Sequence, residues 1–204
     1  MNNIFCKKEA FIKLPFFISY FITDPIEFGI DLELFKKNIE SAIKLSKIDI
    51  ICFRDKISQD KLPYAKIVLA LANKYKIIPI INSDIDLALK LGFCGVHLTS
   101  TQFDKISLAK NKNLFVVISC HTEEEVQLAK NLKADMVTYS PIFYKENKGD
   151  PKGIDDLSKV VRKYQDNNFF IIALGGIITN THIKQIQSTN ARGFASIRFF
   201  HKLK

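Results

Sequence analysis

The feature that most constrains the fold of this 204-residue chain is a repeated alternation between short apolar runs and amphipathic stretches. The runs are rich in Ile, Val and Phe, have the length of strands, and lie at 16–23, 48–53, 77–81, 95–98, 114–119, 136–139, 169–173 and 193–198. Strands that are apolar on both faces and alternate with helices form parallel sheets. Eight such units in about 200 residues match the smallest (β/α)8 barrels. The sequence therefore predicts an α/β protein folded as a (β/α)8 TIM barrel.

Amphipathic stretches between the runs predict helices at 32–46, 59–75, 85–91, 103–110, 123–132, 154–164 and 181–188. Helix starts are marked by Ser58, by Asp84, and by Thr122 with Glu125 three residues later, the spacing of a capping box. Only residues 199–204 follow the eighth run, too few for a full helix. We therefore expect a short or missing eighth helix. The gap beside the first strand would be covered by residues 1–15 or by a partner subunit, so a homodimer is a candidate assembly.

A single domain at 16–204, preceded by an N-terminal extension at 1–15, accounts for the length of the chain. A doubly wound open sheet is the alternative architecture. Against it, the first run is followed by Thr23-Asp24-Pro25 rather than by the glycine-rich turn of dinucleotide-binding sheets.

The composition limits the classes of partner. The formal charge is +9, but lysines carry most of it and are spread along helical faces, without an arginine-rich arm. This pattern favours a solvated lysine surface with a local anion site over nucleic-acid binding. No apolar run reaches membrane-spanning length, no signal peptide is recognisable, and the four cysteines form no C-x-x-C pair. We expect a cytoplasmic protein without nucleic-acid or membrane partners and without a disulfide framework or zinc site.

Residues that follow the predicted strands gather at the end of a barrel that carries active sites. Gly175-Gly176 follows the seventh strand, and Ser196, Ile197 and Arg198 end the eighth. Glycine lets backbone N–H groups approach an oxyanion, and barrels commonly hold a phosphate here, although a plain tight turn is the alternative. We predict phosphate binding by these residues and substrate binding by polar residues after other strands, namely Arg54, Lys56, Asn82, Ser119 and Lys148.

His121 is the candidate general acid–base, because it stands just after the fifth strand and an imidazole titrates near neutral pH. His97 is expected to be a strand residue that faces the barrel or the packing layer, and His182 and His201 are expected to lie on the surface. Asp84 and Asp104 are better explained as residues at helix N-termini than as metal ligands. The sequence therefore predicts no metal site.

These motifs, in this order, resemble the thiamine phosphate synthase/TenI superfamily from Tyr20 to Arg198. Each motif is weak alone, and the ordered set is specific. The matching stretches are Phe21-Ile22-Thr23-Asp24, Phe53-Arg54-Asp55-Lys56, Ile81-Asn82, Asp86-Leu87-Ala88-Leu89, Gly95-Val96-His97-Leu98, Ser119-Cys120-His121-Thr122, Ser140-Pro141-Ile142-Phe143, Lys148, Ala173-Leu174-Gly175-Gly176-Ile177 and Gly193-Phe194-Ala195-Ser196-Ile197.

The resemblance implies one of two activities. Synthases join a pyrimidine diphosphate to a thiazole phosphate with magnesium, whereas tautomerases move one proton in a thiazole carboxylate phosphate without a metal. The chain departs from the synthase pattern where Cys52 replaces a glutamine and where Ser83 and Gln102 replace two magnesium-binding carboxylates. The Thr-x-Thr-Lys loop of synthases reads 145–148 Lys-Glu-Asn-Lys. Magnesium normally requires one or two protein carboxylates, so these departures favour the tautomerase branch.

The resemblance then assigns roles to the predicted site. Backbone at Gly175, Gly176 and 196–198 would hold the phosphate of a phosphorylated thiazole, and His121 would move the proton. Arg54 or Lys56 would balance the carboxylate of the substrate. The expected enzyme is an isomerase without a cofactor. Two alternatives stay open: a thiamine phosphate synthase that uses magnesium, and an inactive barrel that binds a thiamine precursor and acts through a partner.

Overall fold

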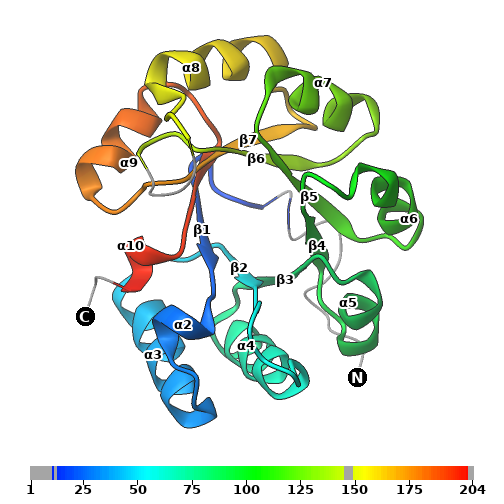
Figure 1. Ribbon diagram of the computed structural model, residues 1–204, viewed down its shortest axis with the longest axis vertical. Coiled ribbons are helices and arrows are strands. Elements are labelled where there is room, and N and C mark those ends of the chain that lie inside the picture. The colour runs from blue at the N-terminus through cyan, green and yellow to red at the C-terminus, as the bar shows by residue number, and fades with distance from the viewer. Residues whose placement is uncertain (1–10, 12, 145–148, 202–204) are drawn as a thin grey trace.

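The computed structural model describes residues 11, 13–144 and 149–201 and shows a closed barrel of eight parallel strands in chain order (Figure 1). β8 pairs with β1 as well as with β7, so the sheet has no free edge. The predicted TIM barrel is confirmed, and the open-sheet alternative is wrong. The strands are β1 (Ile18–Ile22), β2 (Ile50–Phe53), β3 (Ile78–Asn82), β4 (Gly95–Leu98), β5 (Phe115–Cys120), β6 (Met136–Tyr139), β7 (Phe170–Leu174) and β8 (Gly193–Ser196).

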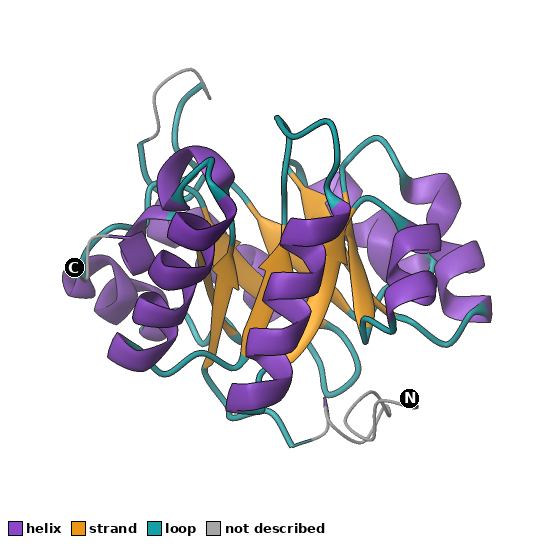
Figure 2. Ribbon diagram, turned by 90° about the horizontal axis from the view of Figure 1, so that it is seen from below, coloured by secondary structure: helices purple, strands orange, loops and turns teal. Residues whose placement is uncertain are grey.

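Helices surround the strands on the outside of the barrel (Figure 2). They are α2 (Pro25–Phe28), α3 (Leu32–Leu45), α4 (Leu62–Tyr75), α5 (Ile85–Leu91), η1 (Phe103–Lys105), α6 (Ile106–Asn111), α7 (Glu123–Asn131), α8 (Gly153–Tyr164), α9 (Asn180–Gln187) and α10 (Arg198–His201). The capping box of Thr122 and Glu125 forms as predicted.

The predicted start of the second helix at Ser58 is wrong. The backbone N–H of Ser58 donates to Asp55 Oδ1 at 3.0 Å, within the loop that follows β2. Helix α4 begins only at Leu62, with Pro63 in its first turn. Proline is favoured there because the first N–H groups of a helix lack intrahelical acceptors.

Two apolar cores stabilise the barrel. Strand residues alternate between them, so that Ile18 and Tyr20 belong to the core inside the barrel while Phe21 packs outward against the helices. Phe11 and Leu14 join the inner core, and the ring of Phe11 stacks 3.7 Å from that of Phe115, the first residue of β5. The described part of the N-terminal extension therefore closes the N-terminal end of the barrel and does not cover the gap beside β1.

That gap is filled by the short helices α2 and α10, which lie side by side near α3 in Figure 1. Helix α10 has four residues, which confirms a short eighth helix, and its Phe200 is buried against the rings of Phe21 and Phe194. Of the segment 1–15, which was expected to cover the gap, residues 1–10 and 12 lie outside the described residues, and the described Phe11 and Leu14 pack inside the barrel instead. The alternative cover, a partner subunit, stays a prediction. Helix α2 was not predicted, although Asp24 as N-cap and Pro25 in the first turn are its sequence signals.

Within the described residues, no helix combines the length and apolarity needed to cross a membrane. Cys52 and Cys120 are free and buried. Cys94 is disulfide-bonded, which the spacing of the cysteines did not predict.

Candidate functional site

His121 stands at the C-terminal end of β5, where the backbone turns into α7. Its backbone N–H donates to the carboxylate of Glu125, and its ring Nδ1 lies 3.1 Å from the carbonyl oxygen of Ser140. The same Nδ1 lies 3.2 Å from Ser140 Oγ, a hydroxyl that can donate or accept. A carbonyl oxygen only accepts, so the tautomer that satisfies the Ser140 carbonyl has its proton on Nδ1. The Nε2 atom of this half-buried side chain is then left with a lone pair that can accept a proton from a bound molecule.

The turns after β7 and β8 lie side by side. The hydroxyl of Ser196 donates to the carbonyl oxygen of Ile177 at 2.8 Å and accepts from the N–H of Phe199 at 3.1 Å. The Ser196 side chain is therefore occupied in joining the turns. Within the described residues, the N–H groups of Gly176 and Ile197 donate to no acceptor. The predicted phosphate-binding backbone is thus brought together, with two N–H groups available to an anion.

The glycine pair has a packing requirement of its own. Gly175 and Gly176 adopt φ of +97° and +72°, and a Cβ at Gly176 would lie 2.6 Å from the carbonyl oxygens of Phe143 and Tyr144. The loop after β6 crosses here, and its Phe143 N–H donates to the carbonyl of Gly175 at 3.0 Å. Glycine is therefore required at these positions with or without an anion, so the residue type alone does not identify a phosphate site.

Of the four predicted cationic side chains, two pair with carboxylates of α2 and its N-cap. The Arg54 guanidinium pairs with the carboxylate of Asp24, at the start of α2. Arg198 instead points along α10 to Glu27, with Nε 3.6 Å from the carboxylate, so only its backbone belongs to the turn after β8. Lys56 is exposed in the loop after β2, and Lys148 lies outside the described residues.

Asn82 and Gln102 hold the loops after β3 and β4 together. The Asn82 amide donates to the carbonyl of His97 at 2.9 Å. The Gln102 amide donates to the carbonyl of Ser83 at 3.2 Å, while its oxygen accepts from the N–H of Thr99 at 3.0 Å. The bridging role of Gln102 was not foreseen, since the sequence identified this residue only as a replacement for a carboxylate.

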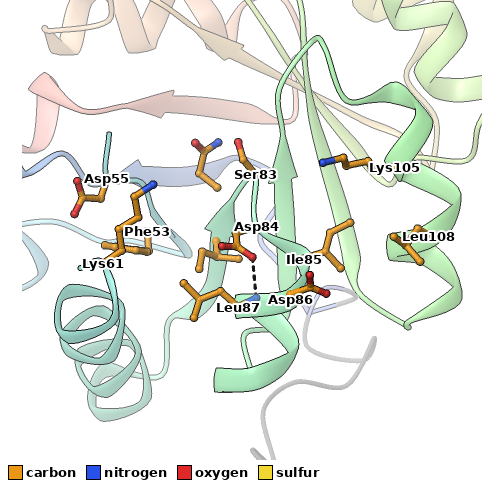
Figure 3. A pocket seen from close by; sticks show the side chains of 12 residues that line it. Phe53, Asp55, Lys61, Ser83, Asp84, Ile85, Asp86, Leu87, Lys105 and Leu108 are labelled. Carbon is orange, nitrogen blue, oxygen red and sulfur yellow. Dashed lines mark hydrogen bonds between the residues drawn. The ribbon is translucent and has the colours of Figure 1, made fainter. Parts of the chain in front are cut away.

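A pocket of about 390 Å³ is lined by residues from the loops after β2 and β3, from α5 and from the η1–α6 segment, and Asn82 and Ser83 are among its lining residues (Figure 3). Its carboxylates include Asp84, whose Oδ1 accepts from the N–H of Leu87 at 2.8 Å and so caps α5 as predicted. No group of three His, Cys, Asp or Glu side chains in the described chain is placed to hold a metal ion. His121 does not line this pocket, so we assign the pocket no part in the chemistry of His121.

His97 lies inside the barrel, the first of its two expected positions, and is only 3% exposed. Burial, together with the nearby charge of Arg54, lowers the pKa of its imidazole to about 3, so the ring is neutral. Its two nitrogens contact three hydroxyl groups that come from β1, β5 and β6, those of Tyr20, Ser119 and Thr138. This network was not predicted, although four polar residues at inward-facing strand positions were its signal.

A model of the family described as thiamine monophosphate synthase matches residues 19–200. The chain belongs to this family. A relative from Aquifex aeolicus, named putative thiamine-phosphate synthase 2, is 34% identical over 186 residues, covering 89% of this chain and 96% of the relative. Thiamine-phosphate synthase 1 of Streptococcus pneumoniae R6 is 30% identical over 174 residues, covering 78% of each chain.

Solved structures show the same fold. The thiamine phosphate pyrophosphorylase from Pyrococcus furiosus superposes with a TM-score of 0.73 at 19% identity, covering 91% of this chain and 95% of the other. A structure described as native KDPGal superposes with a TM-score of 0.69 at 16% identity, covering 90% and 82%. The family match therefore places the chain in thiamine biosynthesis, while these structural likenesses speak for the barrel alone.

Proposed function

We propose that this member of the thiamine monophosphate synthase family is a metal-independent thiazole tautomerase. The observation that carries the proposal is the orientation of His121, whose Nδ1 faces the carbonyl and the hydroxyl of Ser140, so that Nε2 is the nitrogen left for a bound molecule. The substrate class, a phosphorylated thiazole carboxylate, follows from the resemblance to the tautomerase branch. The adjacent turns after β7 and β8 offer the N–H groups of Gly176 and Ile197 to its phosphate.

The residues at the positions of the synthase magnesium ligands do not fit that ion. Ser83 and Gln102 bring a hydroxyl and an amide where carboxylates would be required, and both amide atoms of Gln102 are occupied by the backbone. The nearest carboxylate in sequence, that of Asp84, caps α5. Magnesium prefers near-octahedral oxygen ligands that include carboxylates, so no step of the proposed reaction is assigned to it.

The proposed reaction needs one residue to move one proton. His121 Nε2 takes the proton from the ring carbon, and the resulting imidazolium keeps its Nδ1–H bond to Ser140, which stabilises the positive charge. The same nitrogen returns the proton to the exocyclic carbon, so that the ring becomes aromatic and the charge balance is restored. Arg54 is the candidate countercharge for the substrate carboxylate, because it directly follows β2 and so lies at the same end of the barrel as His121. In this role its guanidinium would exchange its ion pair with Asp24 for the substrate.

Thiamine phosphate synthase is the second candidate, and it is favoured by the names of the curated relatives. In that reaction a pyrimidine diphosphate would be joined to a thiazole phosphate. The two candidates differ in their need for a divalent cation and in their products. An inactive barrel that binds a thiamine precursor is the third, and it requires that His121 be dispensable.

Substitution of His121 tests the proposal. We expect His121→Gln to lower kcat for aromatisation of the thiazole carboxylate phosphate by about 10² to 10⁴-fold, the usual contribution of a general acid–base. His201→Gln is the matched control, because His201 lies on α10 against Glu27 and should leave turnover unchanged. A His121→Gln protein with wild-type turnover would contradict the assignment and favour a binding role.

A further inference from the structure

A chain of four polar side chains crosses the barrel interior beneath His121, and the proposed reaction gives it no role. Tyr20 Oη lies 2.7 Å from His97 Nδ1, and Ser119 Oγ lies 3.0 Å from His97 Nε2. Thr138 Oγ1 is 3.3 Å from the same Nε2 and 3.5 Å from Ser119 Oγ. Tyr20, His97 and Thr138 are buried, whereas Ser119 is partly exposed.

The direction of the hydrogen bonds can be worked out from Tyr20. Burial holds the pKa of this phenol well above its usual range, so the hydroxyl keeps its proton. In the described chain the strongest acceptor beside that proton is His97 Nδ1, since the neighbouring Cys52 thiol accepts only weakly. Buried hydroxyl groups are rarely left unbonded, so Nδ1 accepts. Since the ring is neutral, the single proton of the His97 imidazole is then on Nε2.

This tautomer determines what Ser119 can do. His97 Nε2–H donates to Ser119 Oγ, and the Thr138 hydroxyl donates to the same oxygen. With both lone pairs of its oxygen occupied, Ser119 can only donate its own proton. Ser119 lies in β5 and His121 is the first residue after that strand, two positions further on. This spacing puts side chains on the same face as long as the backbone stays extended.

We propose that His97 is a positioning residue that fixes Ser119 as a hydrogen-bond donor toward an acceptor atom of the molecule bound beside His121. The acceptor would be an oxygen or ring nitrogen on which negative charge develops as the proton leaves carbon. In the opposite tautomer, with the proton on Nδ1, His97 Nε2 would accept the hydroxyl proton of Ser119. Ser119 could then only accept a hydrogen bond from the bound molecule. The identity of the substrate rests on the proposed function, whereas the tautomer does not.

The tautomer is tested in the free protein, without substrate. Nitrogen-15 NMR of histidine-labelled protein distinguishes a protonated from an unprotonated ring nitrogen, and His97→Gln assigns the signal by its disappearance. We expect His97 to be protonated on Nε2 and unprotonated on Nδ1 between pH 6 and 8, a range chosen around the unperturbed value of ~6.5. A ring protonated on Nδ1 would overturn the proposal, whatever reaction the protein catalyses.

Kinetics of single and double variants test the positioning role. We expect Ser119→Ala and His97→Leu each to lower kcat by about 10²-fold and to change KM less. This is the usual effect of removing a hydrogen-bond donor to an atom on which negative charge develops. His97→Leu should add little in the Ser119→Ala background, because both changes remove the same bond. His97→Gln should recover much of the rate, since its amide can accept from Tyr20 and donate to Ser119.

Additive losses in the double variant would overturn the proposal, as would a His97→Gln protein no better than a folded His97→Leu protein. Circular dichroism and the unfolding midpoint show whether each variant is folded. If His97→Leu does not fold, the comparison of His97→Gln with Ser119→Ala replaces it, and equal losses would then contradict the positioning role. A wild-type protein without tautomerase turnover would refute the proposed function and leave the tautomer to be decided by NMR.

Discussion

Adding one methyl group at Gly176 should destabilise the protein and displace the loop that follows β6. Gly176 has φ of +72°, and a Cβ there would lie 2.6 Å from the carbonyl oxygens of Phe143 and Tyr144. Both contacts are with backbone, which cannot rotate away as a side chain does. Gly92 is the matched control, since it has φ of +80° but no atom within 4 Å of the position that a methyl group would take.

The two substitutions share one cost and differ in another. Placing alanine in the left-handed region costs roughly 1–2 kcal/mol of the free energy of unfolding at either position. Overpacking adds about 1–3 kcal/mol, and only Gly176→Ala incurs it. We therefore expect a loss of about 1–2 kcal/mol for Gly92→Ala and about 2–5 kcal/mol for Gly176→Ala.

Urea unfolding at equal protein concentration measures the difference, provided that the slopes of the transitions agree. The KM for the phosphorylated substrate should rise for Gly176→Ala and stay unchanged for Gly92→Ala, because only the first change disturbs the turn predicted to hold phosphate. Equal destabilisation of the two variants would refute the argument that the loop requires glycine at 176.

Three further outcomes are expected. Phe200→Ala should cost about 3–5 kcal/mol of the free energy of unfolding, measured in urea, because this ring is 1% exposed and closes the gap beside β1; a loss below about 1 kcal/mol would contradict the role given to α10. The free energy of unfolding should fall as pH decreases from 6.5 toward 3, with a slope of up to about 1.4 kcal/mol per pH unit. In this range the imidazole of His97 binds a proton in the unfolded chain but not in the folded protein, where its pKa is about 3. His97→Gln should flatten this slope, and an unchanged slope would contradict a buried neutral ring. Arg54→Ala should raise KM and lower kcat in steady-state assays of the tautomerase reaction, and unchanged constants would remove Arg54 from the site.

The alternation of strands and helices was predictable because each strand is apolar on both faces and each helix on one. The eight strand runs require no knowledge of distant contacts, and the observed barrel follows from them. The short helix α2 was not predicted, because Pro25–Phe28 is too short to show a helical period. The position of Phe11 inside the N-terminal end of the barrel could not be predicted from the sequence either, because it depends on a ring contact with Phe115, which is distant in sequence.

The candidate site also has features that the sequence predicts and features that it does not. The positions of His121, Asn82 and the turns after β7 and β8 follow from strand ends, which the sequence locates. The orientation of side chains does not, since Arg198 turns to Glu27 and Gln102 to the backbone of Ser83. The hydroxyl groups around His97 come from strands that are up to 77 residues away from it, a juxtaposition that only the closed barrel reveals.

The most direct test of the central claim compares both reactions in one preparation of the protein. Purified enzyme is given either the thiazole carboxylate phosphate or the pyrimidine diphosphate with the thiazole phosphate, each with magnesium and with excess chelator, and the products are separated by chromatography. We predict aromatisation of the thiazole at the same rate in magnesium and in chelator, and no thiamine phosphate. Thiamine phosphate formed at an ordinary enzymatic rate, and only with magnesium, would contradict the account and establish the synthase.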